Sequence, residues 1–337
     1  MVDIDFLKDI VKEIGNEYTQ LASDIDENER YVDTGSYIFN GLVSGSIYGG
    51  VSGNKITAIA GESSTGKTFF SLAVVKNFLD SNPDGYCLYF DTEAAVNKPL
   101  LESRGIDLNR VVVINVVTIE EFRSKALKAI DIYLKKDTEE RKPCMFVLDS
   151  LGMLSTEKEI TDALNDKQVR DMTKSQLVKG AFRMLTLKLG QANVPLIVTN
   201  HTYDVIGAYI PTKEMGGVSG LKYAASTIIY LTKKKEKDGK EVIGNIIKAK
   251  THKSRLSKEN KTVEIRLYYD DRGLDKYYGL LELGEIGGLW KNVAGRYEIG
   301  GKKLYAKQIL ADPETYFTNE VMQALDEIAS KEFSYGS

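Results

Sequence analysis

The stretch of sequence that decides the fold of this chain is Gly61-Glu62-Ser63-Ser64-Thr65-Gly66-Lys67-Thr68. It fits G-x-x-x-x-G-K-[ST], the P-loop pattern in which backbone N–H groups surround the phosphates of a nucleotide. The apolar residues 55–60 before it predict a buried strand, and residues 69–79 after it predict a helix of about three turns. A strand, a glycine-rich loop and a helix in this order place a helix N-terminus against a polyphosphate. The sequence therefore predicts a site for ATP.

The last two residues of this motif carry its ligand chemistry. Lys67 can reach the β and γ phosphates of ATP as a mobile cation, and Thr68 can place its hydroxyl on Mg²⁺. A chance match in an ordinary loop is the alternative, which the correct flanking elements disfavour. ATP and Mg²⁺ are therefore the expected cofactors.

The composition is that of a globular protein, with 337 residues of which 42% are hydrophobic and 28% charged. No run of about 18 apolar residues is present, so no membrane span is expected. The N-terminus lacks the charge pattern of a signal peptide. Cys87 and Cys144 lie in apolar, strand-like runs and are expected to be buried free thiols, which suits a reducing cytoplasm. Two histidines without nearby thiolate or carboxylate ligands do not make a zinc site.

Charge is unevenly distributed along the chain, although the net charge is only −3. Residues 1–30 contain nine Asp and Glu and three Lys and Arg. Residues 233–261 contain eleven Lys and Arg and four Asp and Glu. Such a local excess of positive charge can attract phosphate groups even on an acidic protein, and a solvated lysine-rich hairpin is the alternative interpretation.

Alternating strands and helices predict an α/β fold. We expect strands over 86–90, 110–116, 144–148 and 195–199, with helices over about 119–134 and within 166–189. This order indicates a mostly parallel central sheet with helices on both faces. Three further strands, over 226–231, 242–250 and 262–268, follow without helices and indicate an antiparallel extension.

The regions flanking this core predict three domains. Residues 1–30 read as an acidic amphipathic helix that packs on its own domain or on a neighbouring subunit, because five apolar residues recur at helical spacing. These residues are Ile4, Leu7, Ile10, Val11 and Ile14. Residues 31–54 are rich in Gly and Ser and read as a connector. We expect an N-terminal helical, oligomerisation segment at 1–34, the core at 35–284 and a small α-containing C-terminal subdomain at 285–337.

Polar side chains stand at three predicted strand ends, where parallel sheets bind ligands. Asp149 is placed to hold Mg²⁺ through water. Glu93 can accept a proton from an attacking water as a general base. His201 or Asn200 can sense the γ-phosphate. The alternatives are a helix-capping role for either carboxylate and an ordinary hydrogen-bonding role for the histidine.

Five motifs, in this order, resemble the RecA recombinase family, and the resemblance extends over about residues 35–330. They are Phe90-Asp91-Thr92-Glu93, Val147-Leu148-Asp149-Ser150-Leu151-Gly152, Asn200-His201-Thr202-Tyr203, Met215-Gly216-Gly217-Val218-Ser219-Gly220 and Lys253-Ser254-Arg255. The third and fifth motifs are most similar to the phage UvsX-type branch. Bacterial members usually carry Gln where His201 stands and Lys where Arg255 stands.

The resemblance implies a RecA-like P-loop ATPase core and a DNA-dependent ATPase. Members form helical filaments on single-stranded DNA, with ATP between neighbouring subunits, and catalyse homologous pairing and strand exchange in recombination and repair. Glu93 is the implied catalytic base, and His201 the implied link between nucleotide state and DNA binding. Lys253 and Arg255 are implied to reach the γ-phosphate of the adjacent subunit.

The partners implied are single- and double-stranded DNA, further copies of the chain, single-strand-binding proteins and mediator proteins, with no membrane. The location implied is the cytoplasm, that of a bacterial host if the chain is phage-encoded.

Two loops, at about 155–167 and 203–220, are implied to be disordered and to carry the DNA. The second is long and glycine-rich for a tight connection, and its tyrosines and lysine can stack on bases and contact phosphates. The first loop is not basic, so its backbone amides and its lysines would have to make the contacts with DNA. The candidate DNA-binding residues are Ser155, Lys158, Lys167, Tyr203, Tyr209, Lys213, Gly216 and Gly217. A mobile surface loop without ligand is the alternative.

Lys253 and Arg255 are two residues apart, so both can project from one face of a strand end and neutralise transition-state charge. Ordinary membership of the lysine-rich hairpin is the alternative. For the whole chain, two other functions stay open: a hexameric DNA helicase on the same core, and a nucleotide-gated DNA-binding filament or mediator protein with little turnover.

Overall fold

The computed structural model describes residues 4–15, 19–24, 30–166, 172–204, 213–216, 219–270 and 272–336. The chain divides into two compact units, residues 1–30 and residues 31–337. The first unit contains the helix α1 (Ile4–Ile14) and a 3₁₀ turn, η1 (Ala22–Asp24). The predicted N-terminal helix is therefore confirmed over its first part only, since α1 ends before Gly15. None of the residues of α1 is buried within the described part of the chain.

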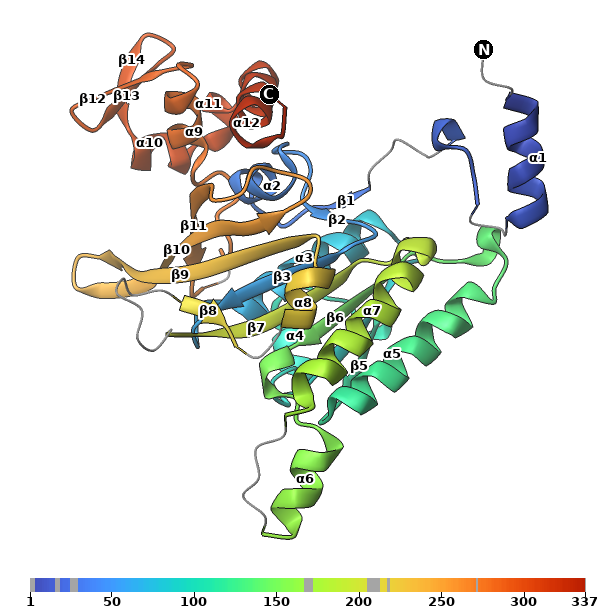
Figure 1. The fold of residues 1–337 in the computed structure, drawn as a ribbon. Coiled ribbons are helices and arrows are strands. Elements are labelled where there is room, and N and C mark those ends of the chain that lie inside the picture. Colours follow the sequence, from blue (N-terminus) through green and yellow to red (C-terminus); the bar gives the residue numbers. More distant parts are fainter. Residues whose placement is uncertain are drawn as a thin grey trace. The chain divides into compact units, whose positions relative to one another are not determined.

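A nine-stranded sheet forms the centre of the second unit, counted over the described residues (Figure 1). Eight strands follow the order β11-β10-β9-β3-β7-β6-β4-β5, and β8 (Lys213–Met215) pairs with β7. The eight are β3 (Ile56–Gly61), β4 (Tyr86–Asp91), β5 (Val111–Asn115), β6 (Cys144–Asp149), β7 (Leu196–Asp204), β9 (Thr227–Asp238), β10 (Glu241–Ser254) and β11 (Thr262–Tyr268). Pairing is parallel from β9 to β5 and antiparallel among β9, β10 and β11. The predicted mostly parallel sheet with an antiparallel extension is confirmed.

Helices cover both faces of this sheet (Figure 1). They are α2 (Tyr37–Ser44), α3 (Lys67–Ser81), α4 (Lys98–Ser103), α5 (Ile119–Leu134), α7 (Lys174–Ala192) and α8 (Ser219–Ala224), whereas α6 (Glu157–Leu164) projects away from the sheet and buries no residue. Alternate residues of β3 serve two hydrophobic cores, because successive strand side chains point to opposite faces. Ile59 packs in the core that includes α2 and α3, whereas Ala58 and Ala60 pack in the core that includes α5 and α7.

The predicted connector at 31–54 is wrong. Residues 31–54 contain α2 and two short strands, β1 (Tyr31–Val32) and β2 (Val51–Ser52), which pair antiparallel. Ile38, Phe39 and Leu42 of α2 are buried in the core. The apolar face of this short helix decides the structure, although Gly and Ser surround it.

The C-terminal region packs on α2. It contains α9 (Leu280–Ile286), β12 (Lys291–Val293), β13 (Arg296–Ile299), β14 (Lys302–Tyr305), α10 (Ala306–Ala311), α11 (Pro313–Tyr316) and α12 (Asn319–Phe333). Asp326 of α12 accepts hydrogen bonds from the Ser46 hydroxyl at 2.7 Å and the Ile47 N–H at 2.8 Å. The three-stranded sheet of β12, β13 and β14 was not predicted. The proposed domain boundaries themselves stay a prediction.

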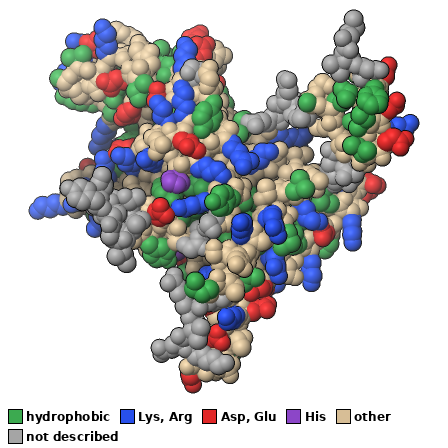
Figure 2. All heavy atoms as spheres, in the orientation of Figure 1, with side chains coloured by type: hydrophobic (Ala, Val, Ile, Leu, Met, Phe, Trp, Pro, Cys, Tyr) green, Lys and Arg blue, Asp and Glu red, His purple; other side chains and the backbone are tan. Residues whose placement is uncertain are grey.

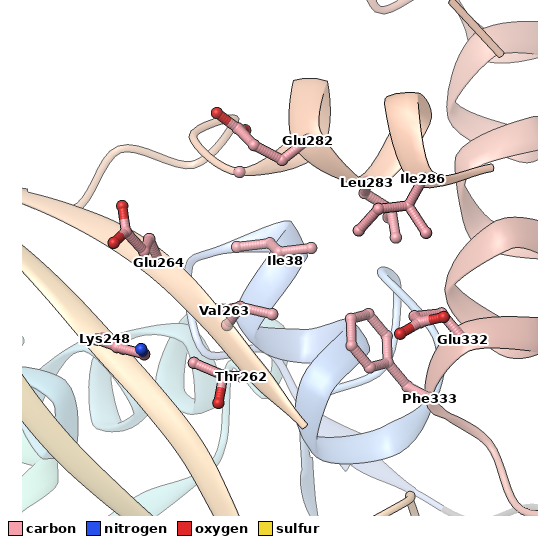
Figure 3. A pocket seen from close by; sticks show the side chains of 11 residues that line it. Ile38, Lys248, Thr262, Val263, Glu264, Glu282, Leu283, Ile286, Glu332 and Phe333 are labelled. Carbon is pink, nitrogen blue, oxygen red and sulfur yellow. The ribbon is translucent and has the colours of Figure 1, made fainter. Parts of the chain in front are cut away.

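A cavity of about 310 Å³ lies between this region and the sheet (Figure 3). Its apolar lining comes from Ile38, Val263, Leu283, Ile286 and Phe333, and its charged lining from Lys248, Glu264, Glu282 and Glu332. None of these lining residues belongs to the P-loop or to the predicted strand-end site.

Two smaller expectations can be checked directly. Cys87 and Cys144 are free and buried, as predicted. Among the described residues, none of the helices combines the length and the apolar character needed to pass through a lipid bilayer.

Candidate nucleotide site and DNA-contact surface

The P-loop joins the carboxyl end of β3 to the first residue of α3, Lys67. Gly66 has φ 89°, a left-handed conformation that glycine adopts without strain. Gly61 is needed for close packing instead, since a Cβ there would lie 2.6 Å from Thr65 Oγ1 and 2.8 Å from the Leu231 carbonyl oxygen. The structure therefore explains why glycine stands at both of these positions of the motif.

Lys67 lies folded into the loop, with only 7% of its surface exposed. Its ammonium donates hydrogen bonds to the carbonyl oxygens of Gly61 at 3.0 Å and Glu62 at 2.8 Å. Burial lowers the pKa of Lys67, and the nearby carboxylates of Asp149 and Glu93 oppose this effect. The predicted phosphate-binding cation and the two predicted acidic residues are thus brought together.

Asp149 ends β6 and is held by hydroxyl groups. The Tyr89 hydroxyl donates to Asp149 Oδ2 at 2.8 Å, and the Thr199 hydroxyl donates to Asp149 Oδ1. Asp149 stands opposite Asp91 in the register of β6 and β4, so the two strand ends coincide. Asp91 organises the turn after β4, because it accepts from the backbone N–H of Glu93 at 3.0 Å.

The predicted base and the predicted sensor contact each other. The Ser150 hydroxyl donates to Glu93 Oε1 at 2.8 Å, and His201 Nε2 lies 3.5 Å from the same oxygen. Asn200, the alternative sensor, is buried, and its Nδ2 has no hydrogen-bond partner within the described part of the chain. Its Oδ1 accepts from the His201 N–H at 2.9 Å. The strand ends that the sequence singled out therefore meet at one edge of the sheet.

Two lysines from different strands contact the P-loop. Lys213 of β8 forms an ion pair with Glu62, which raises the pKa of Lys213 and lowers that of Glu62. Lys233 of β9 donates to the Ser64 carbonyl oxygen at 2.6 Å. Lys213, a predicted DNA contact, is thus joined to the nucleotide loop.

The first predicted DNA loop is largely helical, which corrects the expectation of a disordered segment at 155–167. Its helix, α6, begins with a capping box in which Thr156 and Glu159 satisfy each other's backbone N–H groups. Ser155 forms a β-bridge with Thr118, and Lys158 lies on α6. Lys167 lies outside the described residues.

The second predicted loop, at 203–220, is paired where it begins and again over 213–215, and its last two residues begin α8, which corrects its expected disorder in these parts. Tyr203 of β7 stands opposite Glu214 of β8. Tyr203 is 59% exposed, and a Cβ at Gly216 would lie 2.4 Å from its ring. Glycine at 216 therefore leaves room for the tyrosine. Tyr209 and Gly217 lie outside the described residues.

The two predicted interface cations differ in their surroundings. The Lys253 ammonium donates to carbonyl oxygens at the end of α8, those of Lys222 at 2.7 Å, Ala225 at 2.8 Å and Tyr223 at 3.2 Å. Burial, and next the charge of Arg255, lower the pKa of Lys253. The Arg255 side chain is exposed. Lys253 is thus engaged within its own chain, and its reach to a neighbour stays a prediction.

The hairpin of β9 and β10 carries the predicted basic excess. Lys and Arg side chains gather along it, at the left in Figure 2. Those on β9 and at the turn are Lys233, Lys234, Lys235, Lys237 and Lys240. Lys234 is paired with Glu264 of β11 at 3.5 Å, so acidic neighbours offset part of the charge.

The sequence patterns did not identify four residues of this site, namely Tyr89, Ser150, Thr199 and Lys233. The first three are polar positions inside or directly after apolar strands, and Lys233 is one of many lysines on its hairpin. A search for hydroxyl residues near the carboxyl ends of the strands would have named the first three as candidates, but it could not have shown that Tyr89 and Thr199 contact Asp149.

Comparison with known proteins gives consistent matches. Residues 4–275 match the family described as RecA N-terminal domain. The recombination and repair protein of Enterobacteria phage T4 is 35% identical over 262 residues, 77% of this chain and 65% of that protein. The RecA protein of Paracoccus denitrificans is 27% identical over 271 residues, 78% of this chain and 72% of that protein. The RecA protein of Rickettsia africae is 27% identical over 294 residues, 84% and 80% of the two chains.

Proposed function

The chain belongs to the RecA family, and we propose that it is an ATP-dependent recombinase that assembles on single-stranded DNA and exchanges that strand with a homologous duplex. The observation that carries the proposal is the meeting of Lys67, Asp149, Glu93 and His201 at one edge of the sheet. The T4 relative, a recombination and repair protein, supports the same activity.

The nucleotide site supports ATP hydrolysis. The N–H groups of the P-loop and the Lys67 ammonium bind the phosphates. The Thr68 hydroxyl and the Asp149 carboxylate would hold Mg²⁺, which would supply neutralisation of the phosphate charge. These residues fit the ion, because hydroxyl and carboxylate oxygens are the hard ligands that Mg²⁺ takes. Glu93 accepts the proton of the attacking water, and Ser150 fixes the orientation of Glu93 through its 2.8 Å hydrogen bond.

The DNA-contact surface begins where the nucleotide site ends. His201 stands two residues before Tyr203 on β7, so a change at the γ-phosphate can pass along the strand to the DNA contact. Tyr203 offers an exposed ring for stacking on a base, and Lys213 offers a cation for a phosphate. Lys158 on α6 supplies a second contact, and Lys167, Tyr209 and Gly217 remain predicted contacts.

Assembly completes the ATP site in this proposal. Arg255 follows the end of β10 and is exposed, so it can neutralise charge on the γ-phosphate of a neighbouring copy. Lys253 assists from the same strand end when it leaves the carbonyl oxygens of α8. Single-strand-binding and mediator proteins are the further partners that we propose.

The test is strand exchange between circular single-stranded DNA and a homologous linear duplex in the presence of ATP and Mg²⁺. We expect joint molecules with the unaltered chain and none with Lys67→Ala. The control is Lys55→Ala. Lys55 is exposed and directly precedes β3, at the end opposite the P-loop, so this variant should keep the activity. Exchange by Lys67→Ala at the normal rate would contradict the proposal, and duplex unwinding by closed rings without exchange would favour a helicase.

A further inference from the structure

A buried network of hydrogen bonds runs from Asp149, one predicted magnesium ligand, to the backbone of Thr68, the other predicted ligand residue. From Asp149, the Tyr89 hydroxyl lies 2.8 Å from Oδ2, and the Thr199 hydroxyl donates to Oδ1. The Tyr89 oxygen lies 3.3 Å from Ser71 Oγ, and Ser71 Oγ donates to the Thr68 carbonyl oxygen at 2.9 Å. This hydrogen-bond network therefore runs from β7 through β6 and β4 to the first turn of α3.

The side chains of this hydrogen-bond network are buried, so each polar atom in it needs a partner. Tyr89, Thr199 and Ser71 have no exposed surface, and Asp149 is only 5% exposed. A buried carboxylate oxygen without a donor is unfavourable, because nothing replaces the water it has lost.

The backbone alone does not orient the Asp149 carboxylate. The last torsion of an aspartate side chain is broad, so the position of a strand end leaves the plane of the carboxylate open. Two donors from different strands, one on each oxygen, select a single plane. The sheet register places Tyr89 two residues before Asp91, which stands opposite Asp149.

We propose that Tyr89 and Thr199 are positioning residues of the magnesium site, which hold the Asp149 carboxylate in the orientation that receives the ion bound with the nucleotide. Ser71 extends the network to the backbone carbonyl oxygen of Thr68, in the helical turn that carries the second proposed ligand. The inference rests on the proposed function, since it requires that the chain binds ATP with Mg²⁺.

The experiment measures the Mg²⁺ concentration that gives half-maximal binding of a fluorescent ATP analogue, without hydrolysis. We expect Tyr89→Phe and Thr199→Val each to raise this concentration about 10-fold to 100-fold, the range typical for supporting residues of metal sites. Thr199→Ser keeps the hydroxyl and is expected to stay within about twofold of the unaltered chain, because the donor to Asp149 remains.

Two controls separate positioning from mere stability. Tyr86→Phe removes a hydroxyl from the same strand, near Cys144 and not at Asp149. Thr227→Val removes a buried hydroxyl oxygen on β9 that has no hydrogen-bond partner within the described part of the chain. Both variants are expected to keep the normal Mg²⁺ dependence. Thermal unfolding without ligand shows which variants are folded.

Two results would overturn the inference, and only the second would also overturn the proposed function. Folded Tyr89→Phe and Thr199→Val variants with lowered melting temperatures and unchanged Mg²⁺ dependence would overturn the inference and leave the proposed function intact. Failure of the unaltered chain to bind the analogue at any Mg²⁺ concentration would overturn the proposed function, and the inference with it. If Tyr89→Phe does not fold, the pair Thr199→Val and Thr199→Ser gives the same test.

Discussion

His201 Nε2 and Glu93 Oε1 lie 3.5 Å apart, across the carboxyl ends of β7 and β4. Ser150 donates to the same Glu93 oxygen at 2.8 Å, so the carboxylate is held from two sides. The proposed base for hydrolysis thus touches the residue proposed to report the γ-phosphate to the DNA hairpin. A substitution at one of the two is expected to change the behaviour of the other.

Glu93→Gln is expected to remove hydrolysis while keeping ATP binding. The amide can still accept the Ser150 hydrogen bond but cannot take a proton, so kcat should fall by about 10²-fold to 10⁴-fold. Phosphate release in the presence of DNA measures kcat, and equilibrium binding of an ATP analogue measures affinity. Glu102→Gln, on the exposed surface of α4, is the matched control. A kcat within twofold of normal would remove Glu93 from the role of base.

His201 is expected to link hydrolysis to DNA binding. His201→Ala should keep hydrolysis without DNA and lose most of the stimulation by single-stranded DNA, because no side chain then joins Glu93 to β7. His201→Gln retains a hydrogen-bonding group of similar reach and should keep part of the stimulation. The ratio of turnover with and without DNA is the measurement. If single-stranded DNA stimulated hydrolysis by His201→Ala as strongly as by the unaltered chain, His201 would not be the residue that links DNA binding to hydrolysis.

The Glu62–Lys213 ion pair predicts a pH dependence. Lys213 lowers the pKa of Glu62, so the contact is present above the ordinary pKa of a glutamate and is lost as the pH falls through the lowered value. Lys213→Gln should therefore raise the Glu62 pKa, measured by NMR titration of its carboxylate. Lys222→Gln, which breaks the nearby Lys222–Glu214 pair, should leave it unchanged.

Salt offers a second check on this pair, because both side chains are partly exposed. Added salt should shrink the difference between Lys213→Gln and the unaltered chain. A Glu62 pKa that is the same in both proteins at low salt would rule the ion pair out in solution.

Gly284 of α9 is expected to secure the C-terminal region. A Cβ there would lie 2.2 Å from Cζ2 of Trp290, whose ring is buried and whose Nε1 donates to the Leu281 carbonyl oxygen at 2.7 Å. Gly284→Ala should therefore lower the free energy of unfolding by about 1–3 kcal/mol, measured by urea denaturation.

Gly180→Ala is the matched control for this substitution. Gly180 lies in α7, where a Cβ would meet nothing within 4 Å. It should therefore raise the free energy of unfolding by about 0.5–1 kcal/mol, since alanine favours a helix. Equal effects of the two substitutions would show that Trp290 moves aside freely.

The parts of the site that follow from chain order could be predicted from the sequence. The P-loop is continuous in sequence, and the ends of parallel strands must meet at one edge, so Lys67, Asp149, Glu93 and His201 could be placed together. The hydroxyls of Tyr89 and Thr199 could not be, because their contact with Asp149 depends on the strand order β4-β6-β7. That order is set by packing over the whole sheet.

Two segments were predicted wrongly, one from its local composition and one from the family resemblance. Gly and Ser around α2 suggested a connector, although the apolar face of this helix fills the core. Residues 155–167 were expected to be disordered by resemblance, whereas the capping box of Thr156 and Glu159 begins a helix there. In both segments a short favourable helix outweighs the average character of the sequence.

In the function proposed above, two copies of the chain share each ATP site, with Lys67 from one copy and Arg255 from its neighbour. Mixing Lys67→Ala with Arg255→Ala on single-stranded DNA tests it most directly, since each variant alone should hydrolyse almost no ATP. In a randomly mixed filament about one quarter of the interfaces combine an intact Lys67 with an intact Arg255. We expect the mixture to recover about that share of normal hydrolysis, whereas hydrolysis equal only to the sum of the two separate variants would show that the two residues do not act on one site.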